Sequence, residues 1–199
     1  VSPDQFENNY RIALEQFNKC IEIHPAYYEA YFGLSDIYAG RKQFDKALYY
    51  NLEAVKHNPK LAITYNSLGS LYFKMQLYDS AIKTINTALQ LQPDYADAYN
   101  NLGSAYFGKG DFDNAIRNYS KAVEISPIYV DAWKNLGSSY GSKKEYDKSI
   151  SAFLKAVELD PNNAEINYFL GLTYKFKGDM LSANKYINRA YELNPSLKK

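Results

Sequence analysis

The sequence has few of the residues that build metal, redox or disulfide sites. Cys20 is its single cysteine, so an internal disulfide is excluded and no pair of thiolates is available for zinc. The two histidines, His24 and His57, have no cluster of cysteines or carboxylates at ligand spacing around them. We therefore expect neither a metal nor a cofactor.

An excess of one charge and long apolar runs are also missing. The 23 basic and 22 acidic residues give a formal net charge of +1, which creates no broad field for nucleic acid or an anionic membrane. No run of about 18 apolar residues occurs, and the first ten residues lack the basic and apolar regions of a signal peptide. These absences disfavour nucleic acid as a partner and exclude direct membrane insertion. The compartment stays unknown, with a soluble cytoplasmic protein as the default expectation.

What the sequence does contain is a strict repeat. Six of its seven prolines stand at one interval of 34 residues: Pro25, Pro59, Pro93, Pro127, Pro161 and Pro195. Composition alone does not produce such a grid, because a globular chain has no reason to place helix-stopping residues at a fixed spacing. The interval indicates an array of similar units.

Each unit contains two apolar patterns typical of helices. When the proline is numbered 32 within its unit, full units begin at residues 28, 62, 96, 130 and 164. Position 4 is then mostly aromatic, position 7 is leucine, position 8 is small and position 11 is tyrosine, which is the i, i+3, i+4, i+7 spacing of one helix face. A second such face follows at positions 17 to 28. Each unit is thus predicted to be a helical hairpin.

Glycine marks two places in the hairpin. At position 8, inside the first helix, it costs about 1 kcal/mol relative to alanine, yet four of the five units have it. We interpret it as room for close approach of the two helices, opposite the small residue at position 20, and expect a leucine at Gly103 to overpack the crossing. Between the helices, Gly110 and Gly178 suit a left-handed helix end, and Lys42, Gln76 and Lys144 fill the same place in other units.

These residues together resemble the tetratricopeptide repeat. The shared features are the aromatic residue at position 4, leucine at 7, a small residue at 8, tyrosine at 11, alanine at 20 and 27, an aromatic residue at 24 and proline at 32. Residues 98–127 and 132–161 are close to the family consensus. Asn51 and Asn167 depart from it, because each places a polar residue where an aromatic one is usual.

The resemblance implies an all-α fold, a right-handed α-solenoid superhelix of helix-turn-helix units that forms one continuous domain. Five full repeats are expected at residues 28–61, 62–95, 96–129, 130–163 and 164–197. The segment 1–27 is expected to be a partial first repeat that supplies only a second helix, with Ser2 as its N-cap and Pro3 at its first helical position.

The resemblance also implies a binding groove. In tetratricopeptide arrays the first helices line a concave face, and positions 2, 5, 6, 9, 12 and 13 point into it. The candidate peptide-binding residues are Asn66, Ser70, Phe73, Asn100, Asn101, Ser104, Phe107, Lys134, Asn135, Ser138 and Tyr168. Amides offer a donor and an acceptor to a peptide backbone, and aromatic rings offer contacts to apolar side chains. The alternative is that these are tolerated polar residues on a solvated face.

Lysines recur near the ends of the first helices and form a candidate basic rim of Lys74, Lys109, Lys143 and Lys177. One interpretation is that the rim orients an acidic ligand. The other is that these lysines only compensate the helix dipoles, with the acidic residues at position 2 doing the same at the opposite ends.

The chain is not expected to be an enzyme, since no polar constellation interrupts the packing pattern. The leading hypothesis is a non-catalytic scaffold or adaptor that binds a protein or peptide segment in the groove. One alternative is a substrate-recruiting domain of a larger enzyme such as a glycosyltransferase. Another is self-association through uncapped helical ends, because no polar helix follows the apolar residues of the last helix: Leu181, Ala183, Tyr186, Ile187, Ala190 and Tyr191.

Overall fold

A computed structural model describes residues 3–198, and its regular elements there are all helical. The chain divides into two compact units, Val1–Pro93 and Asp94–Lys199. The first holds α1 (Pro3–Ile23), α2 (Tyr28–Gly40), α3 (Phe44–His57), α4 (Ala62–Lys74) and α5 (Tyr78–Leu91). The second holds α6 (Ala96–Gly108), α7 (Phe112–Ile125), α8 (Val130–Ser142), α9 (Tyr146–Leu159), α10 (Ala164–Lys177), α11 (Met180–Leu193) and the 3-10 turn η1 (Pro195–Lys198).

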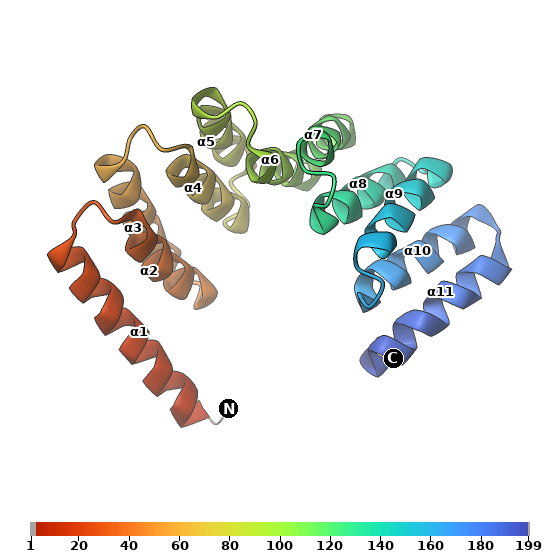
Figure 1. Ribbon diagram of the computed structural model, residues 1–199, viewed down its shortest axis with the longest axis horizontal. Coiled ribbons are helices and arrows are strands. Elements are labelled where there is room, and N and C mark those ends of the chain that lie inside the picture. The colour runs from red at the N-terminus through yellow and green to blue at the C-terminus, as the bar shows by residue number, and fades with distance from the viewer. Residues whose placement is uncertain (1–2, 199) are drawn as a thin grey trace. The chain divides into compact units, whose positions relative to one another are not determined.

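Within each unit the helices stack as hairpins (Figure 1). An odd-numbered helix packs on the even-numbered helix before it and on the one after it, as α7 does on α6 and α8, and as α9 does on α8 and α10. Neighbouring even-numbered helices also touch: α2 with α4, α6 with α8, and α8 with α10. The even-numbered helices therefore form one layer of each unit. The expected all-α fold of stacked helical hairpins is confirmed.

Glycine at position 8 makes room for a side chain from the second helix of the same hairpin. A Cβ atom built on Gly103 would lie 2.8 Å from two ring carbons of Tyr119, and one built on Gly137 would lie 2.9 Å from Cγ of Phe153. Position 20 also faces this point, since the Ser149 hydroxyl donates a 2.8 Å hydrogen bond to the Gly137 carbonyl. The closest approach, however, is to the side chain at position 24 rather than to the small residue at position 20.

The prolines have a second role besides ending helices. The carbonyl oxygen of each proline for which a bond is described accepts a hydrogen bond from the side chain at position 4 of the next repeat. Donors and distances are Tyr31 to Pro25 at 2.8 Å, Tyr65 to Pro59 at 3.1 Å, Trp133 to Pro127 at 2.9 Å and Asn167 to Pro161 at 3.3 Å. Asn167 thus departs from the aromatic pattern but keeps the donor that ties one hairpin to the next.

Asn51 stands at position 24 of the repeat at residues 28–61, in place of the usual aromatic residue, and the residue that it contacts at position 8 also differs from the other repeats. Its side chain is 1% exposed, and its Nδ2 donates to the hydroxyl of Ser35, which stands at position 8 in place of glycine. The Asn51 Oδ1 atom is buried without a hydrogen-bond partner. A polar pair has therefore replaced the apolar contact of the other hairpins, and it leaves one acceptor unsatisfied.

The turns between paired helices adopt the predicted left-handed conformation. Gly110 and Gly178 have φ of +80° and +95°, and Lys42, Gln76 and Lys144 have φ of 58°, 61° and 61°. Three non-glycine residues therefore occupy a backbone region that favours glycine. At the start of the chain, α1 is a single helix of 21 residues that packs on α2. Ser2, the expected N-cap, lies outside the described residues.

The expectation that these residues of the last helix form an open apolar face is wrong. Ala183 and Ala190 are fully buried, and the rings of Tyr186 and Tyr191 pack against Tyr174 and Tyr168 of α10. Ile187 also faces α10, since its Cγ1 lies 2.6 Å from a Cβ atom built on Gly171. Of the six residues named, Leu181 is the one that is strongly exposed, at 85%.

Candidate functional site

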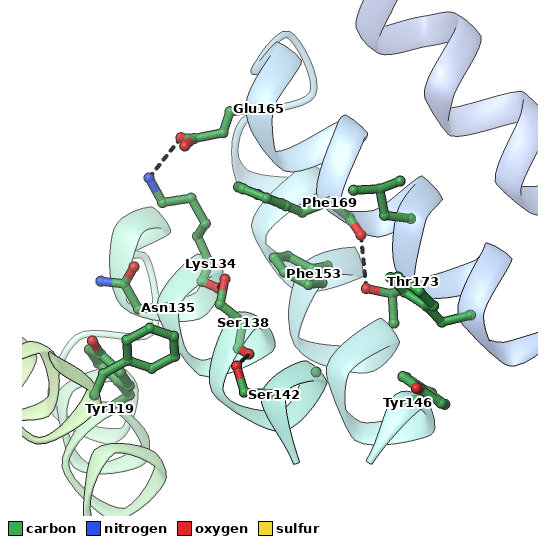
Figure 2. Close-up of a pocket in the computed structure, with 14 residues that line it drawn as sticks. Tyr119, Lys134, Asn135, Ser138, Ser142, Tyr146, Phe153, Glu165, Phe169 and Thr173 are labelled. Atoms are coloured by element: carbon green, nitrogen blue, oxygen red, sulfur yellow. Dashed lines mark hydrogen bonds and ion pairs between the residues drawn. The ribbon is translucent and has the colours of Figure 1, made fainter. Parts of the chain in front are cut away.

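A pocket of about 590 Å³ lies in the second unit, along α8 and α10 (Figure 2). Lys134 and Glu165 lie at one end, Ser142 and Tyr146 lie toward the other, and Phe153 and Phe169 lie between them. Because α8 and α10 carry Lys134 and Glu165 near their first turns, the first end is the one where both helices begin. The full lining is Phe107, Tyr119, Lys134, Asn135, Ser138, Gly141, Ser142, Tyr146, Phe153, Glu165, Phe169, Leu172, Thr173 and Phe176.

Charged groups gather where the helices begin. The Lys134 ammonium contacts the Glu165 carboxylate at 2.9 Å and the Asp131 carboxylate at 3.3 Å. Partial burial on its own lowers the pKa of Lys134, but the hydrogen bonds and charges of Glu165 and Asp131 outweigh it and raise that pKa. Lys134 therefore stays protonated, and two carboxylates share one cation.

The hydroxyl hydrogens of the pocket are committed to the helix backbone. Ser138 donates to the Lys134 carbonyl at 3.1 Å, Ser142 donates to the Ser138 carbonyl at 3.1 Å, and Thr173 donates to the Phe169 carbonyl at 2.8 Å. Asn135 Nδ2 donates to Asn100 Oδ1 at 3.0 Å. Each of these groups keeps lone pairs for a ligand, so they offer mainly hydrogen-bond acceptors.

Aromatic rings form the apolar part of the pocket. Phe153 is 2% exposed, and its ring lies 6.2 Å from that of Phe169, which is 36% exposed. Farther along, Phe176 is 69% exposed, and its ring stacks on Tyr146 at 6.2 Å. Large apolar surface left open to this extent is typical of a contact site.

Tyr119 of α7 lines the pocket with a side chain that is almost entirely buried. Its side chain is 3% exposed, and its hydroxyl donates to Ser104 Oγ at 3.0 Å. Burial raises the pKa of Tyr119 to about 12, while the bond to Ser104 opposes that shift. Tyr119 therefore remains neutral and works as a packing residue with one satisfied polar end.

The structure brings together four of the eleven residues that the sequence nominated: Phe107, Lys134, Asn135 and Ser138 line this pocket. Asn100 and Ser104 lie behind it as hydrogen-bond partners of Asn135 and Tyr119, and Asn100 is 8% exposed. The others stand apart from the pocket lining: Asn101 and Tyr168 in the second unit, and Asn66, Ser70 and Phe73 in the first. Asn66 is itself nearly buried.

Three lysines of the candidate basic rim form ion pairs between consecutive hairpins. Lys143 pairs with Asp113, Lys177 pairs with Asp147 at 2.5 Å, and Lys74 pairs with Asp36 at 3.4 Å. Lys109, the fourth rim residue, is exposed. The aspartates offset the charge of these three lysines, which neither sequence interpretation had anticipated.

Two kinds of pocket residue are not among the eleven candidate peptide-binding residues. Glu165, Phe169, Leu172 and Phe176 occupy positions 2, 6, 9 and 13 of the last repeat, so the groove register applied to that repeat finds them. Tyr119 and Phe153 come from second helices and reach the pocket because the adjacent position 8 is glycine. No groove register includes them, although the glycines were the available signal.

Other kinds of site find no support in the described part of the chain. Within residues 3–198, no cluster of three or more histidine, cysteine or acidic side chains is placed to hold a metal ion. Over the same residues, none of the helices combines the length and the apolar character needed to cross a membrane.

Comparison with known proteins extends these observations. Family models described as tetratricopeptide repeat match residues 6–62, 60–128, 130–163 and 164–197. The crystal structure of MamA is similar with a TM-score of 0.72 and 30% identity over 83% of this chain and 96% of that one. MamA 41-end from Desulfovibrio magneticus RS-1 gives a TM-score of 0.73 and 23% identity over 86% and 97%.

YrrB, described as a TPR protein with an unusual peptide-binding site, gives a TM-score of 0.66 and 22% identity over 92% of this chain and 94% of that one. The comparison with curated proteins finds no match. The fold and these likenesses define a helical repeat protein built from stacked hairpins. The chain belongs to the tetratricopeptide repeat family. Such arrays present extended surfaces to other proteins, and this chain is a protein-interaction scaffold in that general sense.

Proposed function

We propose that the second unit binds a polypeptide segment in the pocket along α8 and α10, and that the protein acts through it as a non-catalytic scaffold. The observation that carries the proposal is the combination of open aromatic surface at Phe169 and Phe176 with hydrogen-bond acceptors along α8. A peptide needs both, because its backbone brings N–H donors and its side chains bring apolar area.

The dimensions of the pocket suit an extended chain. Glu165 and Phe176 are eleven residues apart on α10, which corresponds to about 16 Å at 1.5 Å per residue. An extended peptide rises about 3.3 Å per residue, so about five residues fit along this length. The volume of about 590 Å³ accommodates one or two large side chains in addition to the backbone.

The hydrogen bonds within the pocket favour binding over chemistry. Lys134 is held protonated by two carboxylates, and the serine and threonine hydroxyls donate to their own helix rather than to a general base. A nucleophile requires an adjacent base within hydrogen-bond reach. We therefore assign no catalytic step to this pocket. The description of YrrB as having a peptide-binding site supports the same direction for a protein of similar fold.

The test begins with the selection of random twelve-residue peptides displayed on phage against the whole protein. Affinities of the selected peptides are then measured by fluorescence anisotropy for the wild type and for Phe169→Ala and Asn135→Ala. We expect each substitution to weaken binding at least about tenfold, because it removes a central contact. Leu154→Ala is the matched control, since Leu154 is 38% exposed on α9 and does not line the pocket.

Unchanged affinity for both pocket variants, or a failure to enrich any peptide, would contradict the proposal. An equal loss with Leu154→Ala would show that the substitutions act through stability and not through contact. Thermal unfolding of each variant is recorded alongside to separate these cases.

A further inference from the structure

Acidic groups outnumber basic ones where α8 and α10 begin. Lys134 and Glu165 are the charged residues that line the pocket, and Asp131 shares the Lys134 ammonium with Glu165. The side chains of Asp131 and Glu165 are 66% and 57% exposed, whereas that of Lys134 is 21% exposed. The accessible charge at this end is therefore negative.

Two lysines at the other end of the pocket already have acidic partners. Lys143 pairs with Asp113 and Lys177 pairs with Asp147, each an aspartate of the preceding hairpin. A peptide carboxylate would have to displace these partners, while a peptide cation finds two exposed carboxylates already in place. The charge pattern thus favours a basic ligand over the acidic ligand that one interpretation of the basic rim predicts.

The uncharged polar groups lead in the same direction. The side-chain amide of Asn135 donates one of its two N–H hydrogens to Asn100, and the hydroxyls of Ser138 and Thr173 donate to helix carbonyls. What these groups have left is mainly acceptor capacity. A ligand that satisfies them must bring N–H groups, which peptide backbones, lysine and arginine all supply.

On the basis of the function proposed above, we infer that the partner is a protein segment in which a lysine or arginine lies two residues from an aromatic or long aliphatic side chain. The basic side chain binds the carboxylates of Glu165 and Asp131, and the apolar one packs on Phe169 and Phe153. The spacing follows from α10: Glu165 and Phe169 are four residues apart on one helix face, about 6 Å. Two residues of extended chain cover about the same distance and point to the same side.

The test uses blocked, fluorescein-labelled peptides of twelve residues in a glycine-serine background. One pair contains Lys-Ser-Phe or Phe-Ser-Lys, a second pair has glutamate in place of lysine, and a third has the neutral isostere norleucine. At low salt we expect the lysine peptide of one orientation to bind about fivefold more tightly than its glutamate counterpart, with a smaller difference at 300 mM salt, because exposed charge pairs are modest and screened.

Variants locate the charge effect. We expect Glu165→Gln to reduce the preference for lysine and Glu165→Lys to reverse it. Glu158→Gln is the control, because Glu158 is an exposed carboxylate on α9 that pairs with Lys155 and does not line the pocket. It should leave the preference unchanged.

The outcomes separate this inference from the function on which it builds. If lysine, norleucine and glutamate peptides bind equally well and all lose affinity with Phe169→Ala, the pocket binds peptides but the inference about charge is overturned, and the carboxylates serve only the helix dipoles. A lysine preference that survives both Glu165→Lys and Phe169→Ala places the ligand elsewhere and overturns both. If no lysine peptide binds, the inference is also overturned, and the phage selection remains the test of peptide binding.

Discussion

Replacing Gly103 by alanine tests the close helix contact that organises each hairpin. The new Cβ atom would lie 2.8 Å from Cδ1 and Cε1 of Tyr119, closer than nonbonded carbon atoms approach. The ring has little freedom to move away, because it is 3% exposed and its hydroxyl is bonded to Ser104. We therefore expect the hairpin to shift and the Tyr119 hydrogen bond to weaken.

The magnitude is a balance of three effects. Overpacking costs about 1–3 kcal/mol, and a weakened hydrogen bond adds about 1 kcal/mol. Replacing glycine in a helix returns about 1 kcal/mol. The net loss is about 2 kcal/mol, which for a chain of this length lowers the melting temperature by about 4–8 °C.

Circular dichroism during heating and in urea measures this change. Gly40→Ala is the matched control, because Gly40 is also in a first helix, α2, and an added Cβ there has nothing within 4 Å. We expect Gly40→Ala to be neutral or to stabilise by up to about 1 kcal/mol. A Gly103→Ala protein as stable as the wild type would refute the steric explanation of position 8.

Three further predictions concern polar groups of the fold. Tyr31→Phe removes the hydroxyl that donates to a proline carbonyl at 2.8 Å, and should lower the free energy of unfolding in urea by about 1 kcal/mol; no change would mean that the bond does not tie the repeats. Combining Asn51→Ile with Ser35→Gly restores the apolar pair of the other hairpins and should stabilise by about 1–2 kcal/mol, more than the sum of the single changes in a double-mutant cycle; strict additivity would contradict the coupling. The pKa of Asp111 is lowered from its ordinary value of 3.8 by hydrogen bonds at the start of α7, so its contribution is complete above pH 4 and is lost as the pH falls through the folded-state value; the urea midpoint of Asp111→Asn should therefore fall less steeply below pH 4 than that of the wild type.

The positions of the helices were predictable from the sequence because they depend on local signals. The first helices begin at the residues that the proline grid defines, and Lys42 takes the same left-handed conformation as Gly110 because both close a helix at the same place in the repeat. Each of these features is set by backbone geometry within a few residues. The strict period of the sequence therefore produces the same features in each successive repeat.

The polar contacts between hairpins were not predictable in the same way. Asn135 and Asn101 share a position in consecutive repeats, and the sequence analysis interpreted both as groove residues. In the structure, the side-chain amide of Asn135 donates a hydrogen bond to Asn100. Likewise Lys143 was expected to face a ligand or the helix dipole, whereas it reaches Asp113 of the preceding hairpin. Such bonds depend on side-chain reach between elements, which a one-dimensional pattern does not contain.

The most direct measurement of peptide binding is an NMR titration of the isotope-labelled protein with a phage-selected peptide. The amide signals that shift should belong to α8 and α10, centred on Asn135, Ser138 and Phe169, and the shifts should disappear in Phe169→Ala. Shifts confined to α7, α9 or the first unit, or shifts that persist unchanged in Phe169→Ala, would contradict the assignment of this pocket as the binding site.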